Sequence, residues 1–443
     1  MLKTFSIGGI HPAENKLSAQ NPIATLDLPA QAIVMLAQHI GAPAEPVVQK
    51  GDIVKTGQLI AKASGFVSAN IHAPVSGTIE KIDDVADASG YKRKAIFIKT
   101  DGDEWLETID RTPDLKKEIS LSPAEIIQRI ADAGIVGMGG ATFPTHIKLA
   151  PPPGKKCDIL IINGVECEPY LTADHRVMLE KGDEIMVGIA ILMKALSVNK
   201  AIIGIENNKP DAIAHLNKMA QAYQGISIMP LKVQYPQGGE KQLIDACIGR
   251  QVPSGKLPIE VGAVVQNIGT ALAIYEAVQK NKPLIERVIT VTGKSVSTPG
   301  NYLARIGTPM LSLIEASGGL PVDTGKIIGG GPMMGKALTS IDIPVTKGSS
   351  GLLIMPDREA TRQPMQNCIR CAKCVSACPM GLEPYLLMVL SQKGIWDRAE
   401  EEKVMDCIEC GSCSFTCPSQ RPLLDHIRLG KNKVGQIMRS RTK

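Results

Sequence analysis

The spacing of hydrophobic and polar residues divides the chain into stretches with different periods. Over residues 26–110, short apolar runs alternate with polar residues and end at glycine turns, which predicts β-strands. Over residues 111–284, apolar strand-like runs alternate with amphipathic helical segments, which predicts a layered α/β domain with a largely parallel sheet. Residues 285–345 return to short strand-like runs around one helical segment. The pattern predicts an α/β multidomain protein.

Within residues 111–284 the individual elements follow from the period. A helix over 122–133 begins with Ser-Pro-Ala-Glu, which combines an N-cap, a proline in the first turn and a reciprocal glutamate. Further helices are expected over 182–196 and 209–223, and strands over 157–166, 201–206 and 226–233.

Two of the β-rich stretches resemble known small domains. The phrases QKGDIVKTGQLIA and APVSGTIEKI resemble the biotinyl/lipoyl-type hammerhead, a barrel-sandwich domain. Because no lysine lies between Lys62 and Lys81, we expect a structural or docking domain and no swinging cofactor arm. Residues 285–345 resemble a soluble-ligand-binding β-grasp (SLBB) domain. Its run Gly329–Gly331 is therefore interpreted as tight turns, although a phosphate loop is the alternative.

Composition excludes several classes of protein. The chain has 443 residues, 44% hydrophobic and 21% charged, which fits several globular domains. Aromatic residues make up 3% and the net charge is +5, so a nucleic-acid partner is not expected. No secretory signal and no apolar stretch long enough to span a membrane are evident, which predicts a cytosolic chain with peripheral membrane association. A basic tail, 431–443, is either a solvated terminus or a contact for an anionic lipid or acidic partner.

The cysteine spacing carries the strongest chemical signal. The pattern C-x2-C-x2-C-x3-C-P occurs twice in the last quarter of the chain, as in bacterial two-cluster ferredoxins. In that arrangement the fourth cysteine ligates the other cluster. Structural zinc or disulfides would not explain the repeated three-cysteine run followed by Cys-Pro. We assign one 4Fe–4S cluster to Cys368, Cys371, Cys374 and Cys417, and a second to Cys407, Cys410, Cys413 and Cys378. Cys157, Cys167 and Cys247 are expected to be buried or partly buried free thiols.

A glycine-rich stretch follows the first helix of the α/β segment. Residues 134–148 read GIVGMGGATFPTHIK, and such glycines allow backbone amides to approach a phosphate or a flavin ring closely. The stretch resembles the NADH-binding flavoprotein subunit of respiratory complex I, whose loop has the form GRGGAGFPTGLK. Three later motifs agree in order: NGVECEP with that family's NADEGEPG, YPQGGE with its YxxGEE, and VQNIGT with its VNNVET.

The resemblance implies a role for individual residues. Residues that would line FMN are Gly137, Gly139, Gly140, Lys148, Asn163, Glu166, Tyr235, Gly238, Asn267 and Thr270. Phe143, Glu168 and Glu240 would meet the nicotinamide dinucleotide, with the two glutamates as the candidate catalytic residues. Met138 replaces the family's arginine, Val165 its aspartate and Gly239 the first glutamate of its GEE, so flavin affinity or redox tuning is expected to differ from complex I.

The order of all segments resembles the C subunit of the Rnf electron-transport complex. The SIGGIHP motif, Lys16, the hammerhead, the flavoprotein-like domain, the β-grasp and the ferredoxin-like segment together carry this resemblance. It implies a peripheral, NADH-side subunit on the cytoplasmic face of the cell membrane, within an ion-translocating ferredoxin:NAD⁺ oxidoreductase. The implied cofactors are two 4Fe–4S clusters, FMN and NAD(H), and the implied partners are membrane subunits and a ferredoxin-like iron–sulfur subunit.

The resulting domain prediction places each function in one segment. It comprises an N-terminal arm (1–25), a barrel-sandwich domain (26–110), a Rossmann-like FMN/NADH domain (111–284), an SLBB β-grasp domain (285–345), a two-cluster ferredoxin-like helical domain (355–430) and the basic tail (431–443). Two alternatives stay open. One is a soluble flavin and iron–sulfur NADH dehydrogenase adaptor with a cytosolic partner, and the other is a non-enzymatic electron-transfer scaffold with an empty flavin site.

Overall fold

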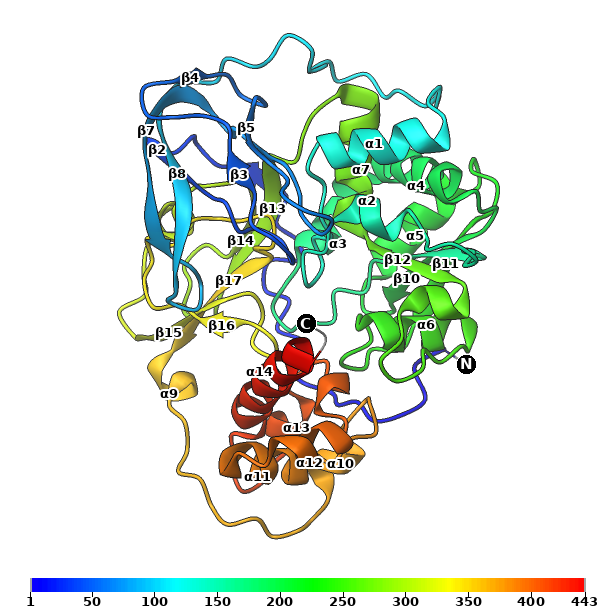
Figure 1. The fold of residues 1–443 in the computed structure, drawn as a ribbon, viewed down its shortest axis with the longest axis vertical. Helices are drawn as coiled ribbons and strands as arrows, with labels where there is room; N and C mark the ends of the chain where they lie inside the picture. Colours follow the sequence, from blue (N-terminus) through cyan, green and yellow to red (C-terminus); the bar gives the residue numbers. More distant parts are fainter. Residues whose placement is uncertain (1, 442–443) are drawn as a thin grey trace.

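The computed structural model describes residues 2–441, and its four domains are visible in Figure 1. The first is a barrel-sandwich of two antiparallel sheets, drawn in blue. One sheet contains β2 (Gln31–Met35), β8 (Lys92–Gly102), β7 (Ser76–Ala86) and β4 (Ile53–Val54). The other contains β3 (Glu45–Pro46), β5 (Leu59–Lys62) and β6 (Ile71–His72). Aliphatic side chains such as Val34, Ile60 and Ile98 are buried between them, because alternate residues of each strand face inward.

The α/β domain is built on a four-stranded parallel sheet in the order β11-β10-β9-β12. Its strands are β9 (Ile159–Asn163), β10 (Ala201–Glu206), β11 (Ile226–Leu231) and β12 (Ala263–Asn267). Its helices are α1 (Pro123–Asp132), α2 (Thr145–Lys148), α3 (Ala173–Glu180), α4 (Gly182–Leu196), α5 (Pro210–Ala220), α6 (Glu240–Ile248), α7 (Ile268–Lys280) and the 3₁₀ turn η1 (Pro258–Val261). The expected helices and strands are thus present, and α1 has the expected capping box at Ser122 and Glu125.

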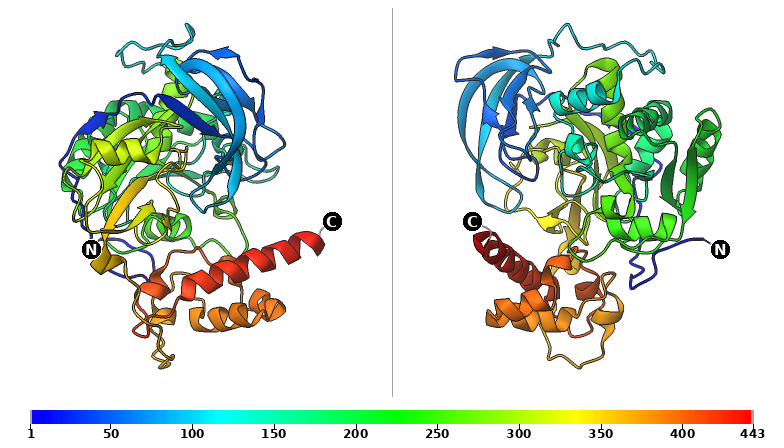
Figure 2. Two further views of the ribbon diagram at one scale, coloured as in Figure 1. Left: turned by 90° about the vertical axis from the view of Figure 1, so that its left-hand side faces the viewer. Right: turned by 45° about the vertical axis from the view of Figure 1, so that its right-hand side comes forward.

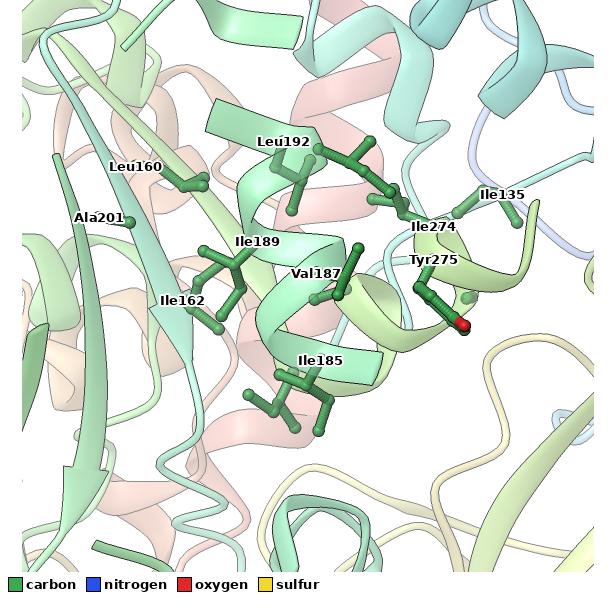
Figure 3. Packing of buried hydrophobic residues seen from close by; sticks show 14 of the residues in the cluster. Ile135, Leu160, Ile162, Ile185, Val187, Ile189, Leu192, Ala201, Ile274 and Tyr275 are labelled. Carbon is green, nitrogen blue, oxygen red and sulfur yellow. The ribbon is translucent and has the colours of Figure 1, made fainter. Parts of the chain in front are cut away.

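Both faces of this sheet are covered, so its strands are apolar on both sides. Leu160 and Ile162 of β9 pack toward α4, as Figure 3 shows, and α7 packs against α4 in the same core. Their neighbours Ile159 and Ile161 face α6 on the opposite side. This explains why residues 159–162 (ILII) form a continuous apolar run with no alternation.

The β-grasp domain contains more of the chain than residues 285–345. Its six-stranded sheet has the order β1-β14-β13-β17-β15-β16. The strands are β1 (Ile23–Thr25), β13 (Glu286–Thr292), β14 (Gly300–Arg305), β15 (Thr324–Gly329), β16 (Lys336–Ala337) and β17 (Gly351–Pro356), with helices α8 (Met310–Ala316) and α9 (Asp357–Ala360). The N-terminal arm contributes β1, which pairs with β14 at one edge of the sheet. Strand β17 lies between β13 and β15 and pairs with both.

The C-terminal domain is helical, and Figure 2 shows α14 as a long rod along one side of it. Its elements are α10 (Lys373–Ser376), α11 (Pro384–Lys393), α12 (Trp396–Glu401), η2 (Val404–Asp406), α13 (Ser412–Phe415) and α14 (Leu423–Arg441). Helix α14 continues through residue 430, where the sequence suggested a boundary, because Val434 is still buried. In the tail, Arg441 pairs with Glu400, while Lys443 lies outside the described residues. Within residues 2–441, no helix combines the length and apolarity needed to cross a bilayer.

Candidate flavin and iron–sulfur sites

The predicted flavin residues gather at one edge of the parallel sheet. After β9 the chain adds β10 and β11 on one side and then returns to place β12 on the other side of β9. Open α/β sheets bind ligands beyond the carboxyl ends of the strands at such a reversal, so the ends of β9 and β12 are the candidate ligand site, and we call this site the crevice. Asn163 ends β9 and Asn267 ends β12, so both predicted residues lie at this point.

The glycine loop closes over the same crevice. Gly137 N–H donates to the Phe143 carbonyl at 2.9 Å, and the Phe143 side chain is half-buried. A side chain at Gly139 would lie 2.7 Å from Asn267 Nδ2, whereas one at Gly140 would meet open space. The loop therefore needs glycine at 139 to approach β12, and position 140 is open to a ligand.

Asn267 and Thr270 organise the first turn of α7. Asn267 Oδ1 accepts from the amides of Gly269 at 2.8 Å and Thr270 at 3.3 Å, as an N-cap does. Thr270 Oγ1 accepts from Met138 N–H at 3.0 Å, which joins the helix to the glycine loop. The positive end of the α7 dipole thus points at the crevice, where an anionic group is favoured.

The loop after β11 supplies the opposite wall. Asn163 Nδ2 donates to the Gly238 carbonyl at 2.8 Å and so ties this loop to β9. Lys148 Nζ, from α2, forms a 2.6 Å ion pair with Glu240 at the start of α6. These two side chains are 30% and 39% exposed, so both remain accessible to a ligand in the crevice.

The other two predicted glutamates make backbone contacts instead. The Glu166 carboxylate accepts from the Asp174 and His175 amides at 2.7 and 3.1 Å, which caps α3. The Glu168 carboxylate accepts from the Met333 and Met334 amides of the β-grasp domain at 3.1 and 2.7 Å. Burial raises the pKa of Glu168 to about 7. These carboxylates shape the loop after β9, and the structure does not place either of them free in the crevice.

Lys16, which the sequence offered only as part of a family motif, fixes this loop from the N-terminal arm. Its buried Nζ donates to the carbonyls of Glu166, Glu168 and Leu171 at 2.8, 2.9 and 2.7 Å. A lysine in a long polar arm has no signal in sequence that would reveal three distant acceptors. The ammonium satisfies carbonyls that β9 and α3 leave unpaired.

Lys16→Met is expected to lower the free energy of unfolding by about 2–4 kcal/mol, because three buried carbonyls lose their donor. Anaerobic thermal melts of holoprotein would show this as a lower melting temperature. Burial lowers the pKa of Lys16 to about 8, so the unfolded chain binds more protons between pH 8 and the ordinary pKa of 10.5. The wild-type protein should therefore gain stability over the variant as the pH rises through this window. An equal gap at pH 7 and pH 10 would contradict the charged, buried state of Lys16.

The two cysteine loops share one backbone conformation. In each repeat the second and fourth residues after the first cysteine, and the third residue after the last, have positive φ. These residues are Arg370, Ala372 and Gly381 in the first repeat and Glu409, Gly411 and Gln420 in the second. Positive φ costs free energy for non-glycine residues, and such conformations concentrate at functional sites. The sequence repeat is thus a structural repeat.

The predicted ligands of one cluster line a single pocket. It lies among apolar residues of α11 and α14, and its walls include all four thiols of the second set, Cys378, Cys407, Cys410 and Cys413. Burial raises the pKa of Cys413 to about 12, and the thiols of Cys378, Cys407 and Cys410 add to this shift. Cys378 comes from the first repeat, so the pocket has the composition that crossed ligation requires.

The other four cysteines are less enclosed. Cys374 and Cys417 are half-buried, and the charge of Cys417 contributes to raising the pKa of Cys374, after the larger effect of burial. Cys368 and Cys371 are exposed on the loop before α10. Within residues 2–441, no group of three or more Cys, His, Asp or Glu side chains has an arrangement that could hold a single metal ion. The two predicted sets therefore differ in position, one inner and one at the surface.

The pocket lined by Cys378, Cys407, Cys410 and Cys413, called the inner cysteine pocket, contacts the α/β domain. The Tyr235 hydroxyl donates to the Cys410 carbonyl at 2.8 Å, and both residues are buried. Gln242 of α6 donates to the Pro379 carbonyl at 3.2 Å. Cys167 is half-buried as expected, yet it lies in this junction, where its thiol accepts from Gly238 N–H at 3.3 Å. Sequence spacing could not reveal this, because Cys167 has no cysteine partner nearby.

Known proteins similar to this chain cover nearly all of it. The C subunit of the proton-translocating ferredoxin:NAD(+) oxidoreductase complex of Clostridium ljungdahlii is 50% identical over 91% of this chain and 87% of its own length. The C subunit of the Na(+)-translocating complex of Acetobacterium woodii is 44% identical over 96% of both chains. The chain belongs to the RnfC family. This family also includes the C subunit of the ion-translocating oxidoreductase complex of Rhodobacter capsulatus, which is 42% identical over 98% of this chain and 84% of its own length.

Domain families account for the parts of this RnfC chain. The matches are the RnfC barrel sandwich hybrid domain (3–103), the Nuo51 FMN-binding domain (130–276), the SLBB domain (288–337) and the 4Fe-4S dicluster domain (360–418). The multidomain α/β fold and its FMN and two 4Fe–4S clusters are thus confirmed. The open position at Gly140 and the four-thiol pocket fit these groups.

A solved structure shares the fold of this RnfC family member. The crystal structure of the NAD⁺-reducing [NiFe]-hydrogenase in the H2-reduced state superimposes with a TM-score of 0.50 at 18% identity. The match covers 72% of this chain and 63% of that chain. At this identity the likeness concerns the arrangement of elements.

Proposed function

We propose that the chain is a peripheral, cytoplasmic-face subunit of a membrane-bound, ion-translocating ferredoxin:NAD⁺ oxidoreductase, and that it exchanges electrons between NAD(H), FMN and two 4Fe–4S clusters. The observation that carries this proposal is the contact between the flavin crevice and the inner cysteine pocket through Tyr235 and Cys410. In this proposal a two-electron site and a one-electron site lie next to each other in one chain. FMN supplies the chemistry that links the two, since flavins accept and release one or two electrons.

The crevice residues hold and orient the ligands in this proposal. The amides at Gly139 and Gly140, the first turn of α7 and Lys148 favour the flavin phosphate by their positive potential. Gly137, Asn163, Tyr235 and Gly238 shape the walls, and Glu166 acts at a distance by capping α3. Phe143 and Glu240 would meet the nicotinamide dinucleotide, and Glu168 fixes the loop after β9.

The exposed cysteines indicate where electrons would pass between this chain and a partner subunit. Cys368 and Cys371 are exposed, while Cys378, Cys410 and Cys413 of the inner set are buried, and Cys410 packs beside Tyr235 and Ile10. Electron transfer weakens steeply with distance, so we expect a partner subunit to dock over the exposed loop. An iron–sulfur subunit of the same complex fits this role, and membrane subunits hold the assembly at the bilayer.

Anaerobic titration of the purified chain with NADH tests the proposal. The expected result is loss of flavin absorbance followed by reduction of the clusters, seen by electron paramagnetic resonance. Cluster signals without flavin, or flavin that NADH leaves oxidised, would support the empty-site scaffold instead. Recovery of the chain in the soluble fraction of its native cells, with no membrane-bound pool, would support the soluble adaptor.

A further inference from the structure

Two buried cations reach the glycine loop from outside its domain. Lys347, in the segment before β17, donates from Nζ to the carbonyls of Gly134 and Asn70, each at 2.7 Å. Arg287, on β13, donates from Nη1 to the Lys347 carbonyl, and its Nη2 lies 3.5 Å from the Met138 carbonyl. The β-grasp domain thus holds both ends of the turn that leads into the glycine loop.

The backbone of Met138 is held at both its N–H and its C=O group. Its N–H donates to Thr270 Oγ1 on α7, and its carbonyl faces the Arg287 guanidinium. Gly139 and Gly140 come directly after this peptide. A shift of Met138 would therefore displace the amides that line the crevice.

The charge of Arg287 lacks a full counter-charge. The residue is 8% exposed, its Nε has no hydrogen-bond partner, and no carboxylate pairs with it among residues 2–441. Burial lowers the pKa of Arg287 to about 10, and the charge of Asp174 partly offsets this effect. Burial also raises the pKa of Asp174 to about 7, and its Oδ2 accepts from Asn267 Nδ2 at 2.7 Å. Burying an arginine without a counter-ion is costly, which makes an anion in the crevice favourable.

Met138 occupies the position at which the similar glycine loop GRGGAGFPTGLK has its arginine. The sequence suggested a missing charge there, but the structure has a guanidinium beside the same peptide, contributed by β13. The positive charge near the loop is thus supplied by another domain.

We propose that Arg287 is a positioning residue of the flavin site: it holds the Met138 peptide and provides a buried positive charge that balances the bound flavin mononucleotide. This inference rests on the proposed flavin site. Asp174 has the opposite effect, because its carboxylate offsets part of the charge of Arg287.

The test uses full-length holoprotein purified anaerobically, with FMN removed and added back while its fluorescence is followed. Arg287→Met should weaken FMN affinity about tenfold and shift the flavin midpoint potential to more negative values, because reduced flavin loses a stabilising cation. Arg287→Lys should recover most of both properties. Asp174→Asn, which keeps the side-chain shape, should shift the potential in the opposite direction.

Arg305→Met is the matched control. Arg305 lies on β14 of the same sheet, is 12% exposed, and pairs with Asp103 and Glu286 at the hammerhead interface. This variant should lose stability while its FMN affinity and flavin potential stay at the wild-type values. Unchanged affinity and potential in Arg287→Met, or the same shifts in Arg305→Met, would overturn the inference. Failure of the wild-type chain to take up FMN would instead overturn the proposed function.

Discussion

The double variant Cys378→Ala/Cys410→Ala is expected to retain one 4Fe–4S cluster, whereas Cys378→Ala/Cys371→Ala should lose both. The reason is that Cys378 lines the pocket of Cys407, Cys410 and Cys413, although it follows Cys371 in sequence. Iron analysis of anaerobically purified protein should give about four irons per chain for the first double variant and close to none for the second, against about eight in the wild type.

The uncrossed alternative predicts the reverse. If each repeat held its own cluster, Cys378→Ala/Cys371→Ala would keep about four irons and Cys378→Ala/Cys410→Ala would lose both clusters. Cys157→Ala is the control, since this half-buried thiol lies in the α/β domain, away from both repeats. Its iron content should equal that of the wild type. Each double variant lacks two cysteines. A difference in iron content between the two variants therefore reports which cysteines ligate the same cluster, because the number of thiols lost is the same.

Sequence reasoning succeeded where the signal is local or repeated. The apolar period of the α/β segment predicted β9, β10 and β11 with α4 and α5, because a parallel sheet needs covered faces. The two cysteine repeats predicted the cluster domain, because short spacings hold thiolates on one loop. Even the capping box of α1 follows from four consecutive residues.

The rest depended on contacts between distant segments. Nothing near Ile23 indicates that this arm residue pairs with β14, since an edge strand of three residues has no period of its own. The role of Lys16 arises from carbonyls more than a hundred residues away, and the contact of Arg287 with the glycine loop joins it to the similarly distant Met138 carbonyl. Glu166 and Glu168 were predicted to contact the cofactors, but their carboxylates bind backbone amides that only the folded chain brings to them.

Glu240→Ala is expected to weaken NADH binding by about 2 kcal/mol, or roughly thirtyfold in dissociation constant, while both clusters remain. Glu240 starts α6 at the rim of the crevice, and its carboxylate is accessible beside Lys148. A carboxylate in this position can accept hydrogen bonds from a ribose or an amide, and alanine removes the acceptor. Stopped-flow measurement of flavin reduction over a range of NADH concentrations gives the dissociation constant, and iron analysis gives the cluster content.

The ion pair between Glu240 and Lys148 means that loss of FMN from Glu240→Ala would also be informative. Loss of FMN together with the NADH response would mean that Glu240 acts by holding Lys148 against the flavin, since the two side chains form a 2.6 Å ion pair. Glu240→Gln separates the effects, because the amide oxygen still accepts from Lys148 while the negative charge is gone. Glu260→Ala is the control, as Glu260 forms an equally short pair with Lys155 in the same domain but outside the crevice. An NADH dissociation constant in Glu240→Ala equal to that of Glu260→Ala would remove Glu240 from the nicotinamide site.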